Sequence, residues 1–188
     1  KMVVAHHDIV NPTTDNANDN SCSVINAIML KKLKPELNVV LTDGEEFGGI
    51  GSQRLSEQIL DGKFGNIPWV LNLELTGKGG EYFFIGDYPG PLFDHIKTLF
   101  DCPVVRTPFN DSVIFQKNGI DSVVINPIPP IREATEDDLK DKYNVIYKGM
   151  VLDFKMLYNC HSPKDTIDTI SPDDMKEFVE KVLIKILE

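Results

Sequence analysis

Short apolar runs and amphipathic segments alternate along the chain, and their periodicities predict strands and helices. Strands are predicted at 2–5, 38–42, 69–75, 81–85, 104–105 and 122–125, with 38–42 and 122–125 buried. Helices are predicted at 21–34, 52–60, 91–100, 111–118 and 172–187. The segment 144–158 is ambiguous, and we favour a helix. This alternation predicts an α/β fold, a three-layer α/β/α sandwich with a mixed, mostly parallel central sheet, in a single domain spanning 1–188.

The last helix carries the clearest local signals. Ser171 is a candidate N-cap, and Pro172 suits the first turn. The apolar residues that follow recur at helical spacing and predict a core-facing stripe of Met175, Phe178, Val179, Val182, Leu183, Ile186 and Leu187. Elsewhere the pattern is less decisive. In the first helix one apolar face is expected, formed by Val24, Ile25, Ile28 and Met29.

The connecting segments give weaker predictions. Residues 11–20 are rich in Asn, Asp, Thr and Pro and predict a loop. The strands at 69–75 and 81–85 could pair as a hairpin across the glycine-containing turn at 77–80. Residues 127–141 are rich in proline and then acidic, which indicates a surface excursion.

Composition excludes several classes of function. The chain has 188 residues, of which 41% are hydrophobic and 26% charged, and its net charge is −10. This acidity argues against nucleic-acid binding, and no apolar run approaches the roughly 20 residues of a membrane span. The three cysteines form no pair motif, so reduced thiols are expected. Reduced thiols favour a cytoplasmic protein, although a trimmed secreted or periplasmic protein would look the same.

Residues that can bind a metal follow several of the predicted strands. They are His6, Asp19, Glu45, Glu46, Glu74 and His161. The carboxyl ends of parallel strands meet at one edge of a sheet, where ligands collect. Each residue alone has a plainer interpretation, such as a polar turn or a solvated charge. Glu74 gives the strongest single signal, because it lies within an otherwise apolar strand and a glutamate there is costly to bury unpaired. Together they could hold two zinc ions and leave one carboxylate to handle protons, which suits peptide hydrolysis.

The order of these segments resembles a known family. The motifs are AHHD, NANDN, LTDGEEFGGIGSQ, NLELTG, NDSVIFQKNGI and HSPKDT, spread over residues 5–169. They resemble the co-catalytic di-zinc aminopeptidase family, which includes bacterial leucyl aminopeptidases, glutamate carboxypeptidases and glutaminyl cyclases. The resemblance implies a zinc-exopeptidase fold over nearly the whole chain.

The resemblance also implies a role for each residue. The metal ligands would be His6 and Glu74 on one Zn²⁺, Glu46 and His161 on the other, and Asp19 bridging both. Asp8 would orient His6, and Asp111 would support the site. Glu45 would be the general base for a zinc-bridging hydroxide. A cis peptide bond between Asp19 and Asn20 is expected to aim the bridging carboxylate.

The predicted function is therefore a zinc-dependent aminopeptidase acting on peptides with a free N-terminus. One alternative is a glutaminyl-peptide cyclotransferase, which would use a single zinc on Asp19, Glu46 and His161. Another is a non-catalytic binding domain of the same fold. Some family members have a tyrosine where this chain has Cys160. The group that stabilises the oxyanion would then be Tyr143, Tyr158 or Arg106, and the sequence does not choose among them.

Overall fold

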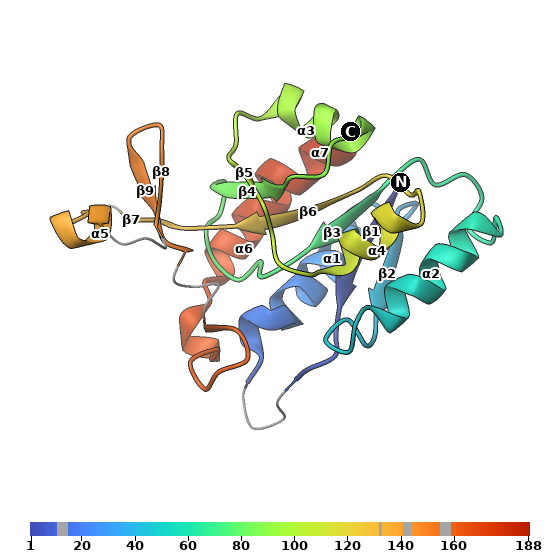
Figure 1. Cartoon of the computed structure of the whole chain (residues 1–188), viewed down its shortest axis with the longest axis horizontal. Coiled ribbons are helices and arrows are strands. Elements are labelled where there is room, and N and C mark those ends of the chain that lie inside the picture. Colours follow the sequence, from blue (N-terminus) through green and yellow to red (C-terminus); the bar gives the residue numbers. More distant parts are fainter. Residues whose placement is uncertain (11–14, 132, 141–143, 155–158) are drawn as a thin grey trace.

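Six strands form one central sheet in this computed structural model, which describes residues 1–10, 15–131, 133–140, 144–154 and 159–188 (Figure 1). The strands are β1 (Met2–His6), β2 (Asn38–Thr42), β3 (Val70–Leu73), β4 (Phe83–Gly86), β5 (Val104–Val105) and β6 (Ser122–Pro127). Their order is β2-β1-β3-β6-β4-β5. The first four in this order are parallel, β4 is antiparallel to β6, and β5 is parallel to β4. The predicted mixed, mostly parallel sheet is confirmed.

Helices cover both faces of the sheet. These helices are α1 (Cys22–Leu33), α2 (Ile50–Leu60), α3 (Pro91–Leu99), α4 (Asp111–Lys117), α6 (Pro172–Phe178) and α7 (Ile184–Leu187). A further helix, α5 (Glu136–Lys140), has no buried residues and lies away from the central sheet (Figure 1). The π-helical segment η4 (Val179–Leu183) joins α6 to α7. One apolar core lies between the sheet and α1, α3 and α6–α7, and a second lies between the sheet and α2 and α4. Among the described residues, no helix combines the length and apolar character that a membrane span needs.

Strand alternation decides which side of the sheet each side chain occupies. In β1, Val3 and Ala5 pack in the core beneath α1, whereas Met2 and Val4 pack in the core beneath α2 and α4. His6 continues the second series at the end of the strand. The parallel strands therefore deliver His6 to the α2 and α4 side, at their carboxyl edge.

The predicted hairpin between the third and fourth strands is wrong. β6 lies between β3 and β4 and pairs with both. All six residues of β6 are buried, which suits a central position. An apolar strand of this kind is most stable when other elements cover both of its faces and both of its edges. The stability gained by placing β6 in the centre outweighs the short connection between β3 and β4 in the sequence.

The predicted helix at 144–158 is also wrong where the structure describes it. β8 (Val145–Tyr147) and β9 (Met150–Leu152) form a hairpin instead, and residues 155–158 lie outside the described part. Lys148 and Gly149 both have positive φ, at 51° and 78°, as a tight two-residue hairpin turn requires. β7 (Pro130–Ile131), in the predicted surface excursion, completes a small antiparallel sheet.

The expected apolar face of α1 is only partly correct, because Val24 and Met29 pack against the core but the other two residues do not. Ile25 and Ile28 are 47% and 43% exposed, whereas Ser23 and Asn26 are fully buried. The polar pair is buried because both side chains bond to Thr76 behind β3, at 3.1 Å and 2.9 Å. Hydrogen bonding has overridden the apolar periodicity here.

Two further expectations change near the site. β2 pairs only with β1, so it is a partly exposed edge strand rather than a buried one. Residues 17–20, expected to be loop, form with Ser21 a π-helical turn, η1 (Ala17–Ser21), that leads into α1. The last helix agrees with the sequence. The Ser171 hydroxyl accepts a hydrogen bond from the Asp174 amide, and the predicted apolar stripe is buried. All three cysteines are free thiols.

Candidate metal centre

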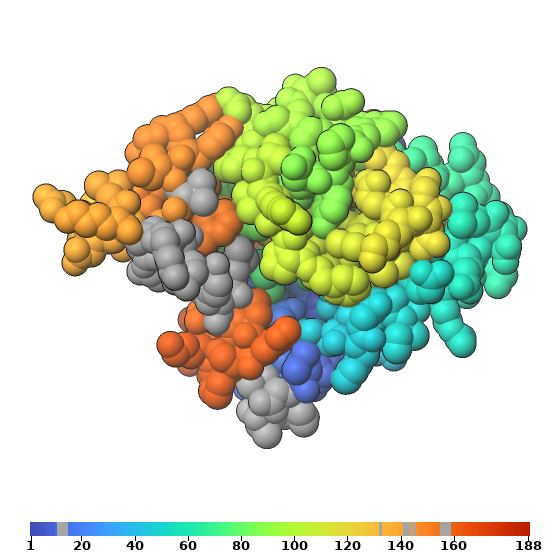
Figure 2. All heavy atoms as spheres, viewed as in Figure 1, coloured from blue at the N-terminus to red at the C-terminus, as the bar shows by residue number. Residues whose placement is uncertain are grey.

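The residues singled out by the sequence meet at the carboxyl edge of the parallel strands. Six of them line one cavity of about 410 Å³, namely His6, Asp19, Glu45, Glu46, Glu74 and His161. They come from the ends of β1, β2 and β3, from η1, and from the segment around residue 160. In Figure 2 the orange-red surface of this last segment borders the blue surface of the N-terminal region. Asp8 and Asp111 lie behind these groups, whereas His7 is exposed.

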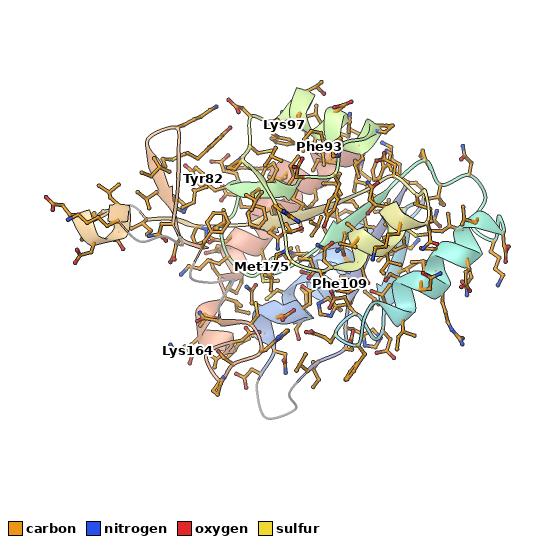
Figure 3. All side chains as sticks on the ribbon, in the orientation of Figure 1. Tyr82, Phe93, Lys97, Phe109, Lys164 and Met175 are labelled. Carbon is orange, nitrogen blue, oxygen red and sulfur yellow. The ribbon has the colours of Figure 1, made fainter. Side chains whose placement is uncertain are left out.

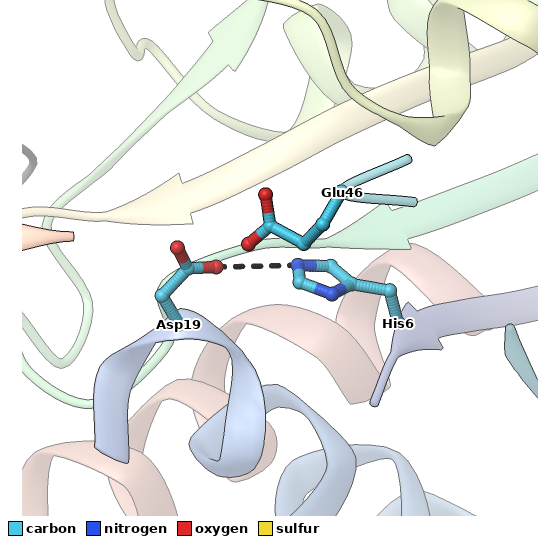
Figure 4. A group of neighbouring side chains, drawn as sticks. All are labelled: His6, Asp19 and Glu46. Carbon is cyan, nitrogen blue, oxygen red and sulfur yellow. Dashed lines mark ion pairs between the residues drawn. The ribbon is translucent and has the colours of Figure 1, made fainter. Parts of the chain in front are cut away.

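Asp19 stands between the two histidines. Its Oδ1 lies 3.2 Å from His6 Nε2, and its Oδ2 lies 3.1 Å from His161 Nε2. Figure 4 shows Asp19 and His6 facing each other, with the Glu46 carboxylate beside them. A carboxylate that presents one oxygen to each of two histidines has the arrangement of a bridging ligand.

Each histidine also meets a glutamate. His161 Nε2 lies 2.8 Å from Glu46 Oε1, and His6 Nε2 lies 3.4 Å from Glu74 Oε2. Ligand atoms on one tetrahedral zinc lie about 3.3 Å apart, since zinc–ligand bonds are about 2.0–2.1 Å long. Three of the four observed separations, at 3.1–3.4 Å, are close to that spacing, whereas the contact between His161 and Glu46 is shorter, at 2.8 Å. His6, Asp19 and Glu46 can also offer atoms that all lie within 4.8 Å of one another. The donor set, two imidazoles and three carboxylates, fits zinc.

The Asp19 backbone is held by a residue distant in the sequence. The Asp165 carboxylate accepts hydrogen bonds from the backbone N–H groups of Asn18 and Asp19, at 2.7 and 3.0 Å. The expected cis peptide bond between Asp19 and Asn20 is present. Asp165 therefore ties the segment that carries His161 to the segment that carries Asp19.

Two asparagines orient the Glu74 carboxylate. Asn20 Nδ2 donates to Oε2 at 3.0 Å, and Asn72 Nδ2 donates to Oε1 at 3.1 Å. Leu75, the next residue, has φ 56°, and His161 has φ 59°. Left-handed conformations are unfavourable for residues other than glycine and collect at functional sites. The sequence analysis gave no role to Asn20 or Asn72, although Asn20 directly follows Asp19.

Asp8 makes its hydrogen bonds to the Glu45–Glu46 turn. Its two oxygens accept the backbone N–H groups of Glu45 and Glu46, at 3.1 Å each. Asp8 Oδ1 lies 3.4 Å from His6 Nδ1, yet that nitrogen has no hydrogen-bond partner among the described residues. Asp111, fully buried, accepts from the Thr42 hydroxyl at 2.6 Å and so braces the end of β2. Both aspartates support the position of Glu45 and Glu46.

The cavity is strongly acidic. Burial raises the pKa of Glu45 to about 9, and the nearby charges of Glu74, Asp111 and Glu46 add to the effect. Burial also raises the pKa of Glu46 and of Glu74. Burial opposes protonation of His6, but the Glu74 and Asp19 carboxylates outweigh it and raise the His6 pKa to about 12. Carboxylates this close repel one another, so the site favours bound positive charge.

Other cavity walls are mainly apolar and were not identified from the sequence. They comprise Leu75, Phe84, Thr107, Pro108, Phe109, Asn110, Val124, Asn126 and Cys160. Of the three residues considered for oxyanion stabilisation, Tyr143 and Tyr158 lie outside the described residues. Arg106 is exposed and does not line the cavity.

The metal-free protein should lose stability as pH rises. The folded state holds protons on Glu45 and His6 that the unfolded chain releases, because both pKa values are raised on folding. The free energy of unfolding should therefore fall from about pH 4.5 to pH 9 through Glu45, and above about pH 6.5 through His6. Thermal melts of chelator-treated protein followed by circular dichroism would measure this. A melting temperature that rises over that range would contradict the electrostatics described above.

Comparisons with known proteins identify the family and the fold. The family model described as peptidase family M28 matches residues 1–184. No curated protein sequence matches the chain significantly. Among solved structures, a zinc aminopeptidase from Bacillus subtilis superposes with a TM-score of 0.72 at 18% identity, covering 99% of this chain and 44% of that chain. LapB from Legionella pneumophila gives 0.72 at 17% identity, covering 99% and 50%.

A glutaminyl cyclase from Porphyromonas gingivalis superposes with a TM-score of 0.67 at 16% identity, covering 98% of this chain and 70% of that chain. The chain spans about half the length of the first two structures. At these identities the structural likeness shows the fold, whereas the family model covers almost every residue. The chain belongs to peptidase family M28.

Proposed function

We propose that this chain is a zinc-dependent aminopeptidase that releases the N-terminal residue of peptides. The observation that carries the proposal is the position of Asp19, with one carboxylate oxygen beside each histidine. This arrangement supports a pair of metal ions sharing one bridging ligand. Membership of a peptidase family supports hydrolysis as the reaction.

Five residues would hold two zinc ions. His6 and Glu74 would bind one, Glu46 and His161 the other, and Asp19 both. Zinc held by nitrogen and oxygen ligands with an open position lowers the pKa of water to about 7 and polarises a carbonyl. The three ligand carboxylates offset most of the charge of two Zn²⁺, which makes their burial tolerable.

Glu45 would be the general base. It lines the cavity, is 7% exposed, and is turned into position by the bonds from its backbone and that of Glu46 to Asp8. In the metal-free protein its raised pKa keeps Glu45 protonated near neutral pH. Two nearby Zn²⁺ would lower that pKa, and the carboxylate could then take a proton from the attacking water and later deliver it to the leaving amine. Among the described residues, no hydrogen bond is observed to its carboxylate, so that group remains available.

The acidic cavity would also select a free N-terminus. Glu45 and Glu74 present carboxylates that attract an ammonium group, and an acetylated terminus offers no such charge. The runner-up is glutaminyl cyclisation, the activity named for the Porphyromonas gingivalis structure. Cyclisation needs one zinc and no attacking water. The second ligand pair, His6 with Glu74, favours two metals and therefore hydrolysis.

The metal content of the protein tests the assignment of two zinc ions. Zinc-loaded protein should contain two Zn²⁺ per chain by elemental analysis, because two sets of ligand atoms share Asp19. Glu46→Gln should lose about one equivalent, since an amide oxygen is a weaker ligand than a carboxylate. Glu36→Gln, at an exposed position, is the matched control and should keep both. A wild-type protein that saturates at one ion would refute the two-metal assignment.

A substitution at Glu45 distinguishes the proposed base from the proposed ligands. Glu45→Gln keeps the shape of the side chain and removes its basicity, so turnover should fall about 10²–10⁴-fold. Its zinc content should match that of the wild type, because Glu45 is not assigned as a ligand. Steady-state kinetics and metal analysis on the same preparation would measure both. Undiminished hydrolysis would exclude Glu45 as the base.

The proposed reaction, release of the N-terminal residue, can be tested directly. The protein should release free N-terminal amino acids from unblocked peptides, detected by mass spectrometry. A chelator should abolish release, and Zn²⁺ should restore it, whereas N-acetylated peptides should resist. Conversion of N-terminal glutamine to pyroglutamate without release of any amino acid would support the cyclase instead.

A further inference from the structure

The cavity has a second wall that belongs to none of the proposed metal ligands. It is formed by Val124 and Asn126 on β6 and by Phe84 on β4. Val124 and Asn126 are two residues apart, so they share a face of the strand, and Phe84 pairs directly with Asn126. The Phe84 ring stacks on Phe154 at 5.2 Å, which fixes this part of the wall. Phe109, labelled in Figure 3, lines the same cavity from the loop before α4.

Asn126 is an unusual residue for this wall. It is 4% exposed, and its Oδ1 has no hydrogen-bond partner among the described residues. The neighbouring polar groups are already engaged. Asn110 bonds to Tyr88, Pro108 and the Ser112 amide, and the Thr107 hydroxyl contacts both Tyr88 and Asn110. A buried amide without a partner is unfavourable, so Asn126 is available for a group that enters the cavity.

The strand order tells which part of a substrate reaches Asn126. β6 adjoins β3, and the Glu74 amide donates to the Ile125 carbonyl, one residue before Asn126. A substrate whose amine is held beside Glu74 would therefore place its first side chain against β6 and Phe84. The apolar part of that side chain would pack on Phe84 and Val124, and its end would meet the Asn126 amide.

We propose that Asn126 selects substrates whose N-terminal side chain ends in an amide, glutamine above all, over apolar side chains of equal length. This inference rests on the proposed aminopeptidase function. An amide side chain offers both a donor and an acceptor, so it can pair with Asn126 in either orientation of the asparagine amide. Methionine matches glutamine in length but would leave Asn126 unpaired.

The test compares release of the first residue from glutaminyl and methionyl amides that carry the same leaving group. For the wild type we expect kcat/KM to favour glutamine by about tenfold. The preference arises because a hydrogen-bonding site rejects an analogue that cannot pair with it. It stays modest because the open cavity admits water, which can pair with Asn126 when methionine is bound. Asn126→Leu, of similar volume, should abolish or reverse the preference. Val124→Ala reshapes the same wall without touching the amide, so the glutamine-to-methionine ratio should stay near that of the wild type.

Three results would overturn the inference. They are a wild type that prefers methionine, a wild type with no preference, and an Asn126→Leu variant whose glutamine-to-methionine ratio is unchanged, whether or not both activities fall. A binding measurement distinguishes failure of this inference from failure of the proposed function. If neither amide is cleaved, calorimetry with zinc-loaded protein should still show tighter binding of free glutamine than of methionine, lost in Asn126→Leu. Equal affinities in the wild type would refute the inference, whereas absent cleavage alone would refute only the aminopeptidase.

Discussion

Mutual repulsion among buried carboxylates is the constraint on which this site depends. Asp19, Glu45, Glu46 and Glu74 line one cavity at the edge of the sheet. Burial and the neighbouring charges raise the pKa values of the three glutamates, so the cluster is costly to ionise without added positive charge. Two histidines alone supply at most two protons. The cluster is therefore better suited to divalent cations than to protons, and the surrounding structure works to hold it in place.

That support comes mainly from polar groups bonded to the backbone. The Asp165 carboxylate accepts hydrogen bonds from the backbone amides of Asn18 and Asp19, and the Asp8 carboxylate accepts them from those of Glu45 and Glu46. Each carboxylate fixes a turn rather than a side chain, so the ligand side chains remain free to face the cavity. Each pairing joins segments far apart in the chain.

The sequence predicts the elements whose signals are local. The last helix was predictable because its cap and apolar stripe lie within one segment, and the metal-binding candidates were found because their order resembles a family. The hairpin was wrong because pairing of β3 with β6 depends on residues about fifty positions apart. Asp165 was missed as a partner of Asp19 for the same reason. In α1, Ile25 and Ile28 were wrongly predicted to be buried. The hydrogen bond from Asn26 to Thr76 turns another face of the helix toward the sheet, and apolar periodicity carries no information about such a bond.

The cavity is built from two parts of the sheet, and this has a consequence for function. The parallel strands β1 to β3 deliver most of the proposed ligands and the proposed base, whereas β6 with the antiparallel β4 supplies another wall of the cavity. In the function proposed above, chemistry and side-chain selection would thus depend on different strands. β6 pairs with β3 along four residues, and its Ile125 carbonyl accepts the Glu74 amide directly after that pairing. Glu74 therefore links the wall that carries Asn126 to the proposed ligands, and a substitution at Asn126 that left this backbone in place would change the wall without moving Asp19.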